Sequence, residues 1–247
     1  MSNDRVRGVR EGPATGENDG APDLISQVYD KLHELIVTGR LAPGARIVES
    51  VVAEKLEVSR TPVRSALQRL QQEGYVVGSD GARRTQLTVA PLTKEDGHEL
   101  FCLVGELEGY AAELAARLPR EERDELVDTL RSINEELRNA SDQRRPDARH
   151  IFDLHTEFHQ KYVDAAAGPR LLALHSVMKP QAERYRRLYS TALGGEIEPS
   201  LREHDEIIEH ITKGDPTAAA EAARQNWRNA AERLVQEIEE LGERGGW

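Results

Sequence analysis

Cysteine and long apolar runs are scarce in this chain of 247 residues. The single cysteine, Cys102, has no partner for an internal disulfide, which is typical of a protein from a reducing compartment. No apolar run approaches the roughly 20 residues needed to span a bilayer, and the first ten residues lack the apolar centre of a secretory signal. The sequence therefore predicts a cytoplasmic protein without a membrane association.

Positively charged residues are also relatively few, since the chain has 33 Lys and Arg but 44 Asp and Glu. The resulting net charge of -11 by itself disfavours a nucleic-acid partner, whose phosphates attract cations. The imbalance is segregated, however. Residues 23–90 hold nine Lys and Arg against eight Asp and Glu, whereas residues 91–247 hold 21 against 32. The acidity therefore belongs to the second of two predicted domains.

Residues 1–22 are rich in glycine and have no apolar periodicity, so they are predicted to form a disordered tail. Residues 23–90 then show the pattern of three helices and a hairpin. Helices are expected over 25–38, over 50–56 and from about 60 to Gly74, with Pro62 in the first turn of the third. Two β-rich segments flank a Gly-Ser-Asp-Gly turn. This pattern predicts a winged helix-turn-helix domain.

Residues 91–247 have helical patterns throughout, separated by glycines. Capping and proline signals place six helix starts at Thr93, Arg120, Asp147, Pro169, Ser200 and Asp215. Six helices joined by short loops form an antiparallel bundle. The predicted fold class is mostly α: an N-terminal winged helix-turn-helix followed by an all-α antiparallel helical bundle.

The stretch "VSRTPVRSALQRLQQEGYV" puts two arginines and two hydroxyl groups at the start of the third helix. The opening turn of such a helix enters the major groove, where Arg reads guanine and hydroxyl groups bind phosphate. Helix dipoles disfavour cations at an N-terminus, so stability alone explains these arginines poorly. We therefore predict DNA contacts from Ser59, Arg60, Thr61 and Arg64, with the wing residue Arg83 near the DNA backbone or minor groove.

The segment "HTEFH" places His155 and His159 four residues apart on one helical face, a spacing at which both can bind one metal ion. His204, from another helix, is a candidate third ligand. Glu157 does not stand where the H-E-x-x-H motif of zinc peptidases needs its general base, so the peptidase interpretation fails. Metal ligands and ordinary core histidines both remain open.

Residues 29–90, and above all the core Ser-Arg-Thr-Pro-Val-Arg, resemble the DNA-binding domain of the GntR family of bacterial transcription regulators. The resemblance implies that Arg60, Thr61 and Arg64 read the operator and that Gly81 lies at the tip of the wing. It also implies double-stranded DNA as the partner.

Residues 92–241 are similar to the FCD effector-binding domain of the FadR-like subfamily, on the segments "HTEFH" and "REHDEIIEHITKGDPTAAAEAARQNW". That resemblance implies a helical bundle that holds a divalent metal such as zinc or nickel through an Asp and three His, beside a small carboxylate or other metabolite. His159 and His204 match this pattern, whereas His155 replaces the acidic ligand and Asn226 the last histidine. Asn226 is thus a candidate effector contact, and a metal-free pocket is the rival.

The helix from Pro169 is predicted to turn Leu174, Met178, Gln181 and Tyr185 inward. Arg184, at the edge of that face, is a candidate for pairing with an anionic effector, although an ordinary solvated arginine is the alternative.

These features together predict a transcription regulator, expected to be a repressor and not an enzyme. It would bind a pseudo-palindromic operator as a homodimer under the control of an organic-acid effector. Two alternatives stay open: a metal-dependent hydrolase that uses the histidines, and a DNA-binding protein that senses nothing. Because neutral imidazole binds metal, metal affinity is expected to fall below a pH of about 6.5.

Overall fold

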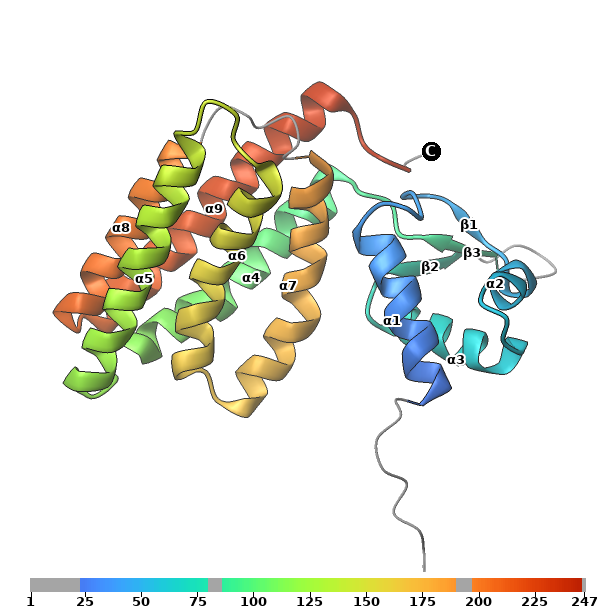
Figure 1. Cartoon of the computed structure of the whole chain (residues 1–247), viewed down its shortest axis with the longest axis horizontal. Helices are drawn as coiled ribbons and strands as arrows, with labels where there is room; N and C mark the ends of the chain where they lie inside the picture. Colours follow the sequence, from blue (N-terminus) through green and yellow to red (C-terminus); the bar gives the residue numbers. More distant parts are fainter. Residues whose placement is uncertain (1–22, 80–85, 190–196, 246–247) are drawn as a thin grey trace, which may run out of the picture.

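The computed structural model of the chain describes residues 23–79, 86–189 and 197–245, so the predicted disordered tail lies outside the described residues. Figure 1 shows two parts beside each other, one of short helices around a small sheet and one of longer helices. The predicted fold class is confirmed. No helix within the described ranges has a stretch that is both long and apolar enough to cross a membrane.

The N-terminal part is a winged helix-turn-helix. Its elements are α1 (Leu24–Val37), β1 (Arg46–Ile47), α2 (Glu49–Lys55), α3 (Arg60–Gln72), β2 (Val76–Ser79) and β3 (Gln86–Val89). The predicted hairpin is confirmed, since β2 and β3 pair antiparallel with Val76 opposite Val89. The strand β1 was not predicted because two residues are too short to show an alternating pattern. It joins the edge of β3 and gives the strand order β1-β3-β2.

The turn between α2 and α3 sets the direction of α3. Glu57 lies there with a φ of 55°, a left-handed backbone conformation that glycine adopts more easily. Ser59 is the N-cap of α3, and Pro62 lies in the first turn, as predicted. The buried side chains of α3 pack on α1 and the sheet, which leaves the opposite face of α3 in solvent; the buried ones are Pro62, Val63, Ala66, Leu67 and Leu70.

The C-terminal part is a helical bundle. Its helices are α4 (Lys94–Ala116), α5 (Arg120–Ser141), α6 (Ala148–Ala166), α7 (Pro169–Tyr189), α8 (Glu198–Lys213) and α9 (Pro216–Leu241). Five of the six predicted starts agree with these bounds within one residue. The helix α8 begins two residues before the predicted Ser200, because Pro199 takes one of its first two positions.

The first and last helices of the bundle, α4 and α9, pack unusually closely through small residues. A Cβ added at Gly105 would lie 2.8 Å from the Trp227 Cβ, and one added at Gly109 would lie 3.1 Å from the Ala220 carbonyl oxygen. Because α4 has no side chain at these two positions, Trp227 and Arg224 of α9 pack directly against its backbone. Glu108 stands between the two glycines in the sequence and accepts from Trp227 of α9 as well as from residues of α6 and α7.

The junction between the two parts is short. Residues just before the first helix of the bundle and just after its last helix pair with each other there. Ala90 and Leu92 connect β3 to α4, and Leu92 forms an isolated antiparallel bridge with Arg244 after the end of α9. The red C-terminal segment in Figure 1 therefore returns toward the winged domain.

Candidate functional site

The start of α3 presents its polar residues to solvent. Ser59, Arg60 and Thr61 are exposed, while Pro62 and Val63 behind them are buried. The Ser59 hydroxyl makes no hydrogen bond to the helix backbone that it caps. These groups are free to meet an external acceptor, and helix N-termini with hydroxyl and guanidinium groups suit phosphate and base edges.

Arg64 lies one turn further along α3 and is held in position by a residue that sequence reasoning did not identify. Its Nε and Nη2 donate to the two carboxylate oxygens of Glu49, at 3.2 and 3.0 Å, across the α2–α3 interface. The hydrogen bond and charge of Glu49 raise the pKa of Arg64. The guanidinium is thus fixed at the surface as a permanent cation. Gly81 and Arg83, the predicted wing contacts, lie outside the described residues.

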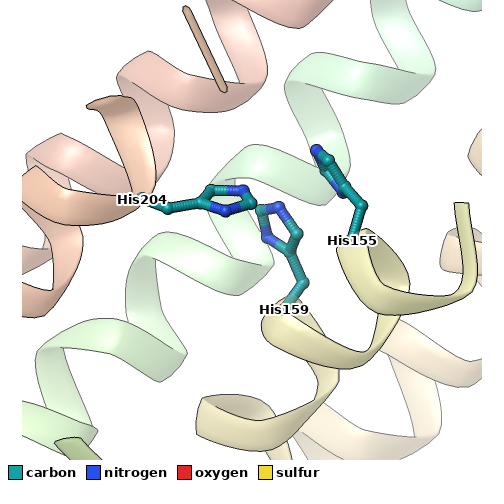
Figure 2. A group of neighbouring side chains, drawn as sticks. All are labelled: His155, His159 and His204. Carbon is teal, nitrogen blue, oxygen red and sulfur yellow. The ribbon is translucent and has the colours of Figure 1, made fainter. Parts of the chain in front are cut away.

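Three histidines meet inside the bundle. His155 and His159 project from α6 and His204 from α8, as Figure 2 shows. Ring centroids are 4.8 Å apart for His155 and His159, 4.8 Å for His155 and His204, and 5.1 Å for His159 and His204. All three side chains are buried. The structure therefore brings together the three residues that were predicted as metal ligands.

Two of these histidines direct a lone pair into the cluster. The Nδ1 of His159 lies 2.6 Å from a Glu108 carboxylate oxygen, and the Nδ1 of His204 lies 3.0 Å from the amide oxygen of Asn134. Both oxygens accept, so each Nδ1 carries the proton and each Nε2 keeps a lone pair. Among the residues that the structure describes, neither Nε2 atom has a hydrogen-bond partner, and both are buried. Buried polar atoms are rarely left unpaired, and metal-binding histidines commonly show this outer-shell arrangement.

His155 is different, because its Nδ1 lies 2.8 Å from Nη1 of Arg186. A guanidinium can only donate, so Nδ1 of His155 accepts and its proton lies on Nε2. One nitrogen from each of the three histidines lies within 4.8 Å of the others. Two nitrogens on one tetrahedral zinc ion lie about 3.4 Å apart, given zinc–nitrogen bonds of about 2.0–2.1 Å. The donor set would therefore have to contract to hold a zinc-like ion, with the lone pairs of His159 and His204 already available.

Glu108 is the centre of the polar network that supports the cluster, and sequence reasoning missed it. It is fully buried, and within the described residues its carboxylate accepts from five donors: His159, Tyr162, His175, Lys179 and Trp227. Burial raises the pKa of Glu108, but the charge of Lys179 and the contact with His159 outweigh burial and hold the pKa well below its usual value. The carboxylate is ionised and paired with the Lys179 ammonium, at 2.7 Å.

A sequence signal for Glu108 existed. It is in helical phase with the buried apolar residues Phe101, Val104 and Ala112 of α4. A charged residue at a position that the pattern assigns to the core is rarely buried unless it is paired.

The three histidines stay neutral well below the pH at which exposed histidine titrates. Burial lowers the pKa of His159 to about 4, even though Glu108 opposes the shift. Burial, followed by the nearby Arg186, lowers the pKa of His155 well below its usual value, and burial lowers that of His204 as well. The expectation that proton competition begins at a pH of about 6.5 is therefore wrong for these buried rings, whose protonation begins at lower pH.

The structure corrects the orientation predicted for α7. Leu174 is 58% exposed rather than inward-facing. Arg184 is buried, but its Nη2 donates to the Ala90 carbonyl oxygen at 2.8 Å, at the domain junction instead of the histidines. The arginine of "ERYRR" that reaches the cluster is Arg186, because neighbours on a helix point about 100° apart.

Asn226 is buried, and its amide nitrogen donates to Glu203 at 2.7 Å. Glu203 also binds Asn229 and Arg233, so the amide of Asn226 belongs to a separate network between α8 and α9. Within the described residues it makes no hydrogen bond to the three histidines.

A winged helix that exposes arginines, joined to a helical bundle with a buried histidine site, is the architecture of a two-domain transcription regulator. Residues 24–83 match the model of bacterial regulatory proteins of the gntR family, and residues 99–229 match that of the FCD domain. The chain belongs to the GntR family of transcription regulators and carries an FCD domain.

Named relatives agree with this assignment. A regulator of Streptomyces ambofaciens, described as an uncharacterized HTH-type transcriptional regulator in an unstable DNA locus, is 32% identical over 81% of this chain and 80% of its own length. A probable D-xylose utilization operon repressor of Paenarthrobacter nicotinovorans is 26% identical over 85% of this chain and 88% of its own. The solved structure of E. coli McbR/YncC has a TM-score of 0.66 at 22% identity, covering 88% of this chain and 100% of that one, which supports the fold.

Proposed function

We propose that this regulator binds a pseudo-palindromic operator as a homodimer and represses transcription, and that a small effector bound in the bundle sets its affinity for DNA. The observation that carries the proposal is the pairing of an exposed cationic start of α3 with a buried histidine cluster that has two unpartnered Nε2 atoms. The first is suited to DNA and the second to a ligand. The relative named as a probable repressor supports repression over activation.

The start of α3 supplies the DNA contacts in this proposal. Arg60 and Arg64 are exposed, and their guanidinium groups fit guanine edges or phosphates. Ser59 and Thr61 bring hydroxyl groups to the same turn, where they fit phosphate oxygens. One winged helix buries little surface, so strong specificity calls for two half-sites read by two protomers.

The histidine cluster is the proposed sensor. His159 and His204 would hold a divalent ion such as zinc or nickel with His155 as the third ligand, while Glu108 and Asn134 orient the first two rings. When bound, such an ion offers open coordination positions to the oxygen atoms of a carboxylate effector. The hydrolase alternative is disfavoured, because the carboxylate that touches the cluster, Glu108, already accepts from five donors and is not available as a general base.

The proposed dimer contact lies on exposed apolar side chains of the bundle. Leu103 and Tyr110 are seven residues apart on one face of α4 and are 46% and 49% exposed. Leu174 and Val177 are also exposed on α7. Large apolar side chains that gather on a helix surface commonly mark contacts with another chain. Analytical ultracentrifugation should show a dimer that Leu103→Glu combined with Tyr110→Glu converts to a monomer; a native monomer would refute this contact.

The metal centre is tested by the metal content and thermal stability of three proteins. The native chain and His150→Ala, which alters an exposed histidine of the same helix, should purify with or take up zinc or nickel and gain thermal stability. His159→Ala should lose both effects. Negligible metal in every protein would refute the centre and leave an organic pocket, and metal that survives His159→Ala would place the ligands elsewhere.

A further inference from the structure

Three consecutive residues of α7 contact three different parts of the molecule. Arg184 donates to the Ala90 carbonyl oxygen at the domain junction. Tyr185 accepts from the Thr93 backbone N–H at 3.2 Å, at the cap of α4. Arg186 donates to His155 in the histidine cluster. A single turn of α7 therefore connects the cluster with the segment that carries the winged domain.

The hydrogen bond between Arg186 and His155 cannot coexist with metal ligation by His155. If His155 bound an ion through Nδ1, the guanidinium would have to leave that nitrogen. If it bound through Nε2, the single proton of the neutral ring would move to Nδ1 and would face a guanidinium that can only donate. Either way the 2.8 Å contact is lost. Full three-histidine ligation therefore requires Arg186 to move.

Electrostatics act in the same direction. Burial lowers the pKa of Arg186 to about 10, which still leaves it a cation at neutral pH. The other cation of the network, Lys179, is neutralised by Glu108, whereas no described carboxylate lies within ion-pair distance of Arg186. A divalent ion at the cluster would therefore repel the guanidinium as well as compete with it for His155.

The C-terminal half of α7 is placed to pass such a movement to the winged domain. Pro180 lies inside the helix and removes one backbone hydrogen bond, so the segment that follows it can tilt at lower cost. After that point Leu188 lies against the end of α1, since a Cβ added at Gly39 would come within 2.7 Å of its Cδ2. Gln181 lies beside Gly74 at the end of α3 in the same way.

We propose that Arg186 is a gate on the histidine site: it holds His155 in a form that cannot ligate, and its release on occupancy shifts the Arg184 and Tyr185 contacts that fix the domain junction. The inference rests on the metal centre proposed above and adds the residue that couples this centre to DNA binding. Arg186 acts through His155 and the junction, so it is a positioning residue.

Calorimetric titration with zinc tests the first half of the proposal. Arg186→Met removes the donor and the charge, so it should bind zinc about tenfold or more tightly than the native chain, an effect within the usual range of coupling between sites. Arg186→Lys restores a cationic donor and should return the affinity toward the native value. Arg187→Met is the matched control, because Arg187 stacks on Phe152 and does not contact His155; its zinc affinity should be native.

Hydrogen–deuterium exchange at residues 90–97 tests the second half. Zinc should speed the exchange of the junction amides, Thr93 included, in the native chain, whereas in Arg186→Met exchange should already be fast and zinc should add nothing. Equal zinc affinity in the native chain and Arg186→Met would overturn the gate while leaving the metal centre intact. Tighter binding without a response at the junction would overturn the coupling. Failure of both proteins to bind zinc would overturn the centre and the gate together.

Discussion

The two domains hold their functional side chains in opposite ways. In the winged domain Arg60 and Arg64 are exposed cations, and Arg64 pairs with Glu49 at the surface. In the bundle His159 and His204 are fully buried and neutral, and each is oriented by a partner that is itself buried. A surface site of permanent cations suits a large anion such as DNA, whereas a buried site with fixed lone pairs suits a small ligand.

The largest expected effect is on the stability of the bundle through Glu108. Glu108→Gln leaves Lys179 as an uncompensated buried charge, which should cost about 3–5 kcal/mol of unfolding free energy. Urea unfolding followed by circular dichroism measures it. Glu99→Gln changes an exposed carboxylate of the same helix that has no ion pair within the described residues, so it is the control and should leave stability unchanged. Adding Lys179→Met to Glu108→Gln should recover part of the loss, and a Glu108→Gln protein as stable as the control would contradict the charge pairing.

Acid should destabilise the bundle through its buried histidines before most of its carboxylates titrate; the exception is Glu237, whose pKa is raised by burial to about 7. The unfolded chain takes up protons on histidine below a pH of about 6.5, whereas folded His159 resists protonation down to a pH of about 4. The unfolded state therefore binds more protons in this window, and stability falls as the pH falls. Between pH 7.5 and 5.5 each of the three cluster histidines should cost about 1.4 kcal/mol of stability, or about 4 kcal/mol together.

The comparison that isolates this effect uses the pH dependence of unfolding, not its absolute value. His204→Asn should reduce the loss between pH 7.5 and 5.5 by about 1.4 kcal/mol, because one of the three cluster histidines is gone. His150→Ala, at the surface of the same bundle, should keep the native dependence. Identical curves for all three proteins would show that the buried rings are not neutral in the folded state.

In the winged domain the same kind of substitution should change DNA binding and leave stability alone. Arg60→Ala or Arg64→Ala should weaken binding to operator DNA roughly tenfold to a hundredfold while the thermal unfolding curve stays native. Arg149→Ala, an exposed arginine of the bundle, is the control. Fluorescence anisotropy with DNA from the regulated promoter measures the affinities; native affinity in both variants would remove the assigned DNA contacts.

The smallest expected effect concerns the turn that aims α3. Glu57 has a positive φ, so Glu57→Gly should relieve backbone strain and stabilise the winged domain by about 0.5–1 kcal/mol. Glu54→Gly, in the right-handed helix α2, should destabilise it by about 0.8–1 kcal/mol. Thermal unfolding distinguishes the two, and equal destabilisation by both would show that the turn is not strained.

Local signals carried the sequence prediction in the winged domain. The proline in the first turn of α3, the glycine after it and the alternating hairpin residues each act over a few positions, and each is confirmed by the structure. The spacing of His155 and His159 is likewise local to one helix. These features depend on backbone periodicity, which a sequence shows directly.

The supporting residues of the bundle could not be predicted in this way. Glu108 lies 51 residues from His159, and Asn134 lies 70 from His204, so only the packing of different helices reveals these contacts. Arg184 and Arg186 illustrate how sensitive such inferences are. The two point about 200° apart around α7, and because the inward face of this helix was misplaced, Arg184 and not Arg186 was taken as the candidate contact.

The central claim is that occupancy of the buried histidine site changes the affinity of the exposed α3 for DNA. Its most direct test is the dissociation constant for promoter DNA, measured with zinc and with a chelator, for the native chain and for His159→Ala. The account predicts a change of about fivefold or more for the native chain, within the usual range of allosteric coupling, and none for His159→Ala, which should still bind DNA. A native affinity that is indifferent to zinc, or an equal response in His159→Ala, would contradict it.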